Sequence, residues 1–264
     1  MVIDMKNLSI NIKTEFILQL KKCSTWVFFL IEFILLSYSI ELTRNELLFL
    51  IAENRIKISY EFPPFINSGM LFVLLFGSTI ALLWGILNIH YDYKYKSHII
   101  RSCLFDWANV LTSKAIIAFY FSLFISLVTT LSSIVSQNIW NHSTPAHAMP
   151  IQNSQINYII LKFLCLLLML WISTLIGMVI GSLVHKTGVS IVIAMIFDQF
   201  ILSKTILFSG FVYIIFSDAE LRTVSTPEPF DTGLPIGLIY LLVLLFIVLL
   251  IFLLRVTAIF KREI

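Results

Sequence analysis

Apolar residues in this chain gather in six long runs separated by shorter polar segments. A helix rises about 1.5 Å per residue and the hydrocarbon core of a bilayer is about 30 Å thick, so about 20 apolar residues span it. The pattern therefore predicts an all-α, polytopic membrane protein in which residues 1–264 form a single transmembrane domain. The six transmembrane helices are expected at residues 24–40, 65–88, 115–135, 158–184, 189–216 and 236–254.

The segment before the first run, residues 5–23, has a different pattern. Leu8, Ile12, Phe16 and Leu20 recur every four residues, and the lysines of this segment lie off that stripe. Such spacing predicts an amphipathic helix with a basic face. A helix of this kind lies in the membrane interface rather than crossing it.

The polar connections also carry a pattern. Between the second and third runs, Ile100, Leu104, Trp107 and Leu111 form an apolar stripe, while Arg101, Asp106 and Asn109 lie elsewhere. This predicts a cytoplasmic helix with its stripe toward lipid headgroups and its polar side toward a partner. An ordinary interfacial loop is the alternative. A short polar turn, residues 185–188, separates the fourth and fifth runs. Residues 41–64 are expected to form an outer loop, with a short interfacial helix at 45–51.

Composition supports the membrane interpretation, and charge gives an orientation. The chain is 59% hydrophobic and 12% charged, against about 25% charged residues in soluble domains. Most lysines and arginines fall in segments on one side; those expected on the other side are Arg44, Arg55, Lys57 and Arg222. The positive-inside rule places the basic side, with both termini, in the cytoplasm. Abundant Ile, Lys, Asn and Phe suggest the cytoplasmic membrane of a bacterium.

Four ionisable residues lie within or near the predicted spans: Glu32, Lys162, Asp198 and Lys204. Charges at membrane depth are costly and therefore face the protein interior or water. Lys162 is near a span end and is expected to snorkel to the interface. Asp198 and Lys204 face different sides of a straight helix and can pair only if the fifth helix breaks. A structural or gating role, a substrate-contacting role and a proton-relay role are the alternatives for Glu32, Asp198 and Lys204.

The small residues Gly177 and Gly181 permit close helix packing, within the chain or across a dimer. No catalytic signature is present: residues 181–187 lack the glycine that precedes the lysine of a phosphate-binding loop, and zinc-protease and serine-hydrolase motifs are missing. His142 and His147 in an outer loop are too few for a metal site. We therefore expect no enzyme activity, no metal and no cofactor bound by this chain, and no nucleic-acid partner.

Four segments of the sequence carry a further resemblance: residues 12–22, residues 91–114, residues 171–186 and residues 259–264. They resemble the permease subunits of ABC-2-type ABC transporters, and in part the lantibiotic- or bacteriocin-immunity group of that family. Gln19 departs from the family pattern, in which a basic residue is common at this position.

The resemblance implies a membrane subunit of an ATP-driven exporter that moves an amphiphilic substrate outward, such as a hydrophobic peptide, an antibiotic or a lipid. It implies separate ABC ATPase subunits, which bind ATP and Mg, and a second permease chain, identical or sister. The residues that the resemblance assigns to ATPase coupling are Arg101, Asp106, Trp107, Asn109, His185 and Lys186. An ATP-independent channel, scaffold or immunity protein is the alternative, and an intramembrane enzyme is the third hypothesis.

Overall fold

The computed structural model describes residues 5–52, 63–94, 107–148, 150–151, 153–184, 186–197 and 242–254, and every regular element in these ranges is helical. The elements are α1 (Met5–Lys21), α2 (Cys23–Ala52), α3 (Pro64–Phe72), the π-helix η1 (Val73–Gly77), α4 (Ser78–Lys94), α6 (Trp107–Ser143), the 3-10 turn η2 (Pro145–His147), α7 (Asn153–Leu183) and α8 (Thr187–Phe197). One further helix covers Leu242–Leu254.

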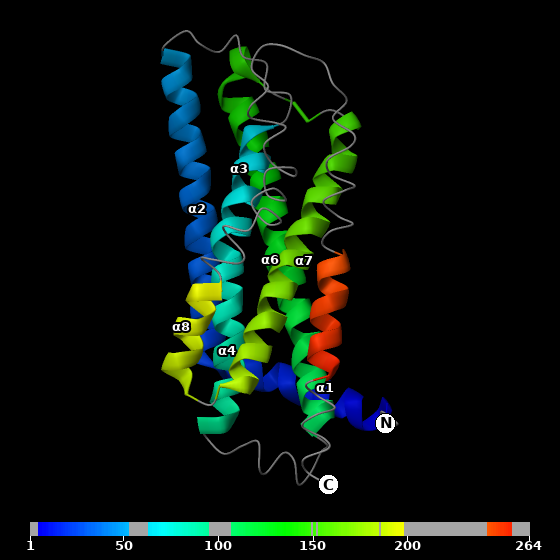
Figure 1. Cartoon of the computed structure of the whole chain (residues 1–264). Helices are drawn as coiled ribbons and strands as arrows, with labels where there is room; N and C mark the ends of the chain where they lie inside the picture. The colour runs from blue at the N-terminus through cyan, green and yellow to red at the C-terminus, as the bar shows by residue number, and fades with distance from the viewer. Residues whose placement is uncertain are drawn as a thin grey trace.

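The long helices form an antiparallel bundle. Three of them, Cys23–Ala52, Asn109–Ser143 and Gln155–Leu183, are long and apolar enough to cross a membrane. Between the first two, α3, η1 and α4 follow one another without a break and run back along α2 (Figure 1). The prediction of an all-helical fold is thereby confirmed for the described residues, and three of the six predicted spans correspond to helices of sufficient length and apolarity.

One boundary differs clearly from the prediction. Residues 41–52 were expected to begin a loop with a separate short helix, but they continue α2 without interruption. The reason lies in the packing of the added turns: Ser39, Thr43 and Leu47 are buried at four-residue spacing, and Leu47 forms a small apolar cluster with Phe65 and Trp140. Tertiary contacts therefore extend a helix whose local sequence is mixed in polarity.

The core is built around α4 and α7, which approach each other closely. A Cβ atom on Gly177 would lie 2.0 Å from the Leu82 carbonyl oxygen, and one on Gly85 would lie 2.3 Å from the Thr174 carbonyl oxygen. Gly181 likewise lies against the backbone of Ile86. The small residues at 177 and 181 thus lie at a helix contact within this chain.

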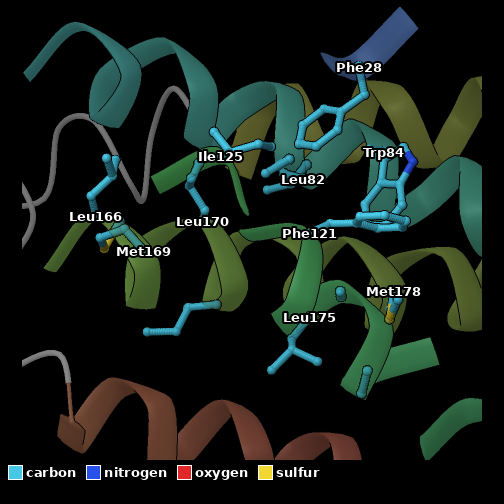
Figure 2. Close-up of a cluster of buried hydrophobic side chains, with 14 of the residues drawn as sticks. Phe28, Leu82, Trp84, Phe121, Ile125, Leu166, Met169, Leu170, Leu175 and Met178 are labelled. Atoms are coloured by element: carbon cyan, nitrogen blue, oxygen red, sulfur yellow. The ribbon is translucent and has the colours of Figure 1, made fainter. Parts of the chain in front are cut away.

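Large side chains fill the space beside this contact. Figure 2 shows Phe28 and Trp84 facing each other, with their ring centroids 5.3 Å apart in a stacked arrangement. Phe121 from α6 meets Trp84 edge to face at 5.5 Å. These aromatic contacts join α2, α4 and α6 into one core.

The last two predicted spans are described in part. α8 covers the beginning of the fifth, and the helix Leu242–Leu254 covers most of the sixth, with Val248 and Phe252 packed against the core. Asp198 and Lys204 lie outside the described residues, so the choice between a continuous and a broken fifth helix stays open.

Candidate functional site

The side of α1 that faces the protein is polar. Asn11, Glu15 and Gln19 are buried at four-residue spacing, whereas Phe16 and Ile17 on another side are exposed. The helix lies across one end of the bundle, where α2 begins and α4 ends (Figure 1). The predicted amphipathic helix is therefore present, but its polar stripe makes the contacts with the bundle.

The partner of this polar face is Lys114, the largest fully buried side chain among the residues whose burial the structure describes. Its Nζ lies 2.7 Å from Glu15 Oε1 and 2.9 Å from Asp92 Oδ2. It also donates to Asn88 Oδ1 at 3.0 Å. The ammonium thus joins α1, α4 and α6, and two carboxylates compensate its charge.

Gln19 and Lys22 complete this network, which we call the end cluster. Gln19 Nε2 donates to Glu15 Oε1 at 2.6 Å and to Asn88 Oδ1. Lys22 Nζ donates to Asn88 Oδ1 at 3.1 Å and lies 4.6 Å from the centre of the Tyr91 ring. The end cluster (Glu15, Gln19, Lys22, Asn88, Asp92 and Lys114) holds two acidic and two basic groups. Its formal charge is balanced, as a buried ionic network requires.

The end cluster holds both ends of the connection that was predicted to couple with a partner. Asp92 lies in the last turn of α4, and Lys114 lies two turns after the start of α6 at Trp107. Arg101 and Asp106 lie outside the described residues, as do the side chains of Trp107 and His185. Lys186 is exposed.

Two residues of this connection differ from the prediction. Leu111 was expected at the lipid headgroups and Asn109 toward the cytoplasm, yet both are buried in the bundle. The physical reason is that α6 begins at Trp107, so these residues already belong to a packed helix. The Asn109 carbonyl accepts a hydrogen bond from Ser113 Oγ at 2.7 Å.

Lys162 also differs from its predicted position. It does not extend to the interface but is buried, and its Nζ donates to Asn67 Oδ1 at 2.5 Å. The amide of Asn67, on α3, supplies an acceptor inside the bundle. Sequence reasoning missed this pair because the two residues are far apart in the chain.

Glu32, in the middle of α2, is buried at 4% exposure. Neither of its carboxylate oxygens has a hydrogen-bond partner among the residues that the structure describes. They lie against Gly77, the last residue of η1: a Cβ atom there would be 2.7 Å from Oε2 and 2.9 Å from Oε1. π-Helical segments inside α-helices occur frequently at functional sites. Of the three intramembrane candidates, Glu32 is the one within the described residues.

An apolar groove of about 750 Å³ opens beside Glu32, between α1, α2 and α6. Volumes of this size hold drug-sized ligands. Most of its lining is aromatic, and we call it the aromatic groove; it is formed by Phe16, Leu20, Trp26, Phe29, Leu30, Phe33, Tyr120, Phe121 and Phe124. The helical spacing of Trp26, Phe29 and Phe33 was a signal for it in the sequence. No pattern in the sequence indicated that residues of α1 and α6 also line this groove.

Comparison of the chain with protein-family models, with curated proteins and with solved structures finds no match. The functional argument therefore rests on the geometry described above.

Proposed function

We propose that this chain is the membrane subunit of an ATP-driven exporter of the ABC-2 type. In this proposal it has six spans with both termini in the cytoplasm, in a bacterial plasma membrane. Separate ATPase subunits bind ATP and Mg, and a second permease chain, identical or sister, completes the transporter. The substrate is amphiphilic: a hydrophobic peptide, an antibiotic or a lipid.

The observation that carries the proposal is the end cluster. A transport subunit without its own ATPase must receive movement from a partner and pass it to its spans. The segment 95–106 joins two helices, α4 and α6, whose ends are tied to α1 by Lys114 at 2.7 Å and 2.9 Å from its two carboxylates. The charged groups of this network are paired, although Asn88 Nδ2 has no hydrogen-bond partner among the described residues, and satisfied buried networks are rigid. A displacement of this segment therefore moves α1, α4 and α6 together.

The charges near the end cluster support a cytoplasmic position for it. Lys13 and Lys21 on α1 are exposed, and so is Lys186 in the turn before α8. These segments lie at the same end of the bundle in Figure 1. Basic residues that flank spans favour the cytoplasmic side, which is the side from which an ATPase docks.

The aromatic groove supports an amphiphilic substrate. Its residues come from α1 at the end of the bundle and from α2 and α6 within it. A molecule with a large apolar part can therefore enter it from the lipid side without crossing the packed core. A polar head can stay at the interface while the apolar part binds.

The decisive experiment is co-purification of this chain from its native membrane with the proposed ABC ATPase subunits. Asp106→Ala combined with Trp107→Ala is expected to leave the chain inserted but to weaken ATPase docking roughly thirtyfold, since interface residues often contribute about 2 kcal/mol. Asn141→Ala with His142→Ala, at the other end of the bundle, is the matched control. Wild-type docking and transport in the first variant would remove the assignment of this segment to coupling.

Two further outcomes belong to the same proposal. The purified chain alone is expected to hydrolyse no ATP. Single cysteines at positions 143 and 226 are expected to react with an impermeant thiol reagent in intact cells, and one at position 97 is not. Labelling at position 97 contradicts the six-span topology.

A further inference from the structure

We propose that Glu32 and the aromatic groove form a binding site for hydrophobic primary amines. The apolar part of the ligand lies on the aromatic side chains, and its ammonium group pairs with the Glu32 carboxylate. These amines would be the substrate of the proposed exporter, and this part of the inference rests on the proposed function. Binding itself requires this chain alone.

The first argument is the missing partner of Glu32. A buried carboxylate without a compensating charge or hydrogen bond is strongly unfavourable. Every other buried acidic side chain in the described part of the chain, Glu15 and Asp92, faces Lys114 within 2.9 Å. Glu32 has no such neighbour there. A cation from a ligand completes the pair that the described residues leave open.

The second argument is the space beside the carboxylate. A small pocket of about 10 Å³ lies between α2 and α6, with Glu32 and Thr129 as its polar lining residues. This volume holds about one water-sized group. A primary ammonium is of that size, whereas a trimethylammonium group is much larger. We call this space the Glu32 pocket.

The third argument is that the pocket and the aromatic groove adjoin each other. Phe29, Phe33 and Phe124 line both spaces. A ligand in the groove therefore needs to extend only past these rings to bring a terminal amine to Glu32. Ammonium groups are also attracted to the faces of aromatic rings. The two spaces together match a molecule with a large apolar body and a small cationic end.

Both carboxylate oxygens of Glu32 are buried and lie against Gly77. The close approach of Gly77 leaves no space for a side chain or a ligand on that side. The Glu32 pocket is lined by α2 and α6, so pairing with a ligand requires the carboxylate to turn from Gly77 toward α6. The π-helical turn before Ser78 sets the rotation of this glycine relative to α2.

The test uses the purified chain in lipid nanodiscs and three dansyl probes of equal apolar size. Dansylcadaverine carries a primary amine, its N-acetyl derivative is neutral, and its N-trimethyl derivative is cationic but bulky. Binding is followed by dansyl fluorescence. We expect the amine to bind roughly 10- to 100-fold more tightly than the acetyl derivative, the range for hydrogen bonds to charged groups. The trimethyl derivative is expected to bind as weakly as the acetyl one.

The matched variants are Glu32→Gln and Glu46→Gln, which remove a charge from a buried and from an exposed position of the same helix. Glu32→Gln is expected to reduce amine affinity to that of the acetyl probe and to leave acetyl binding unchanged. Glu46→Gln is expected to change neither the amine affinity nor the acetyl-probe affinity. Trp26→Phe is expected to reduce energy transfer to the bound dansyl group, which places the probe in the aromatic groove.

Equal affinities of the wild type for the amine and the acetyl probe would overturn the proposal. So would amine binding that is unaffected by Glu32→Gln, which would mean that a proton alone neutralises the carboxylate. Equal binding of the trimethyl probe and the amine would refute the role of the Glu32 pocket.

The comparison of the three probes on the wild-type chain needs no variant, so it tests the proposal even if Glu32→Gln fails to fold. ATPase docking is a separate measurement, and either result can fail without the other.

Discussion

Glu15 and Glu32 are both buried carboxylates near the N-terminal end of the chain, and they differ in one respect. Glu15, at 1% exposure, is held by Lys114 and Gln19. Glu32, at 4% exposure, has no partner in the described residues. A buried charge with its partner in place is part of the architecture, because loss of either member leaves the other unpaired. A buried carboxylate that lacks one among the described residues gains no pairing energy to offset its burial, which is the observation behind the proposed role in binding.

The largest loss of folding stability is expected for a substitution at the centre of the end cluster. Lys114→Met leaves Glu15 and Asp92 buried without their cation, and breaking a buried pair costs about 3–5 kcal/mol. The variant is expected to lose most of its folded population in thermal unfolding of the detergent-solubilised chain. Lys186→Met, at an exposed position, is the control and should melt as the wild type does. A stable Lys114→Met chain would mean that the cluster does not hold α1 to the bundle.

A smaller loss is expected for Glu15→Gln. Asp92 still compensates Lys114, at 2.9 Å, so the charge balance is reduced but not removed. The expected cost is about 1.5–3 kcal/mol, the value of one hydrogen bond to a charged group. Unfolding midpoints in a cycle with Lys114→Met should show strong coupling between the two positions. Additive effects would indicate that the pair contributes little.

The smallest effect is expected at Glu32. Glu32→Gln keeps the shape of the side chain and removes a charge that lacks a partner among the described residues, so the free energy of unfolding should change by less than about 1 kcal/mol or increase. The unfolding midpoint of the variant, measured beside that of Glu41→Gln at an exposed position of α2, tests this. A loss as large as that of Lys114→Met would make Glu32 a structural residue and remove its contrast with Glu15.

The sequence predicted much of the fold because long apolar runs have few alternatives in a bilayer. The runs at 115–135 and 158–184 lie inside or almost entirely inside α6 and α7, and α1 covers residues 5–21 of the amphipathic segment predicted at 5–23. The candidate site was less accessible. Glu32 stood out as an acid inside an apolar run, but the absence of a partner depends on which side chains α4 and α6 place around it.

What the sequence alone determined is therefore the type of each element and its membrane character, because these depend on local periodicity and on the length of apolar runs. Which face of an element packs inward was decided by the tertiary structure. In α1 the apolar stripe and the polar stripe share the same four-residue period. The polar stripe is the buried one because Asn88, Asp92 and Lys114, which are distant from α1 in the sequence, lie against it in the fold. In a soluble protein water would have favoured the opposite arrangement; beside lipid, exposed apolar side chains cost little, and paired charges hold the helix in place.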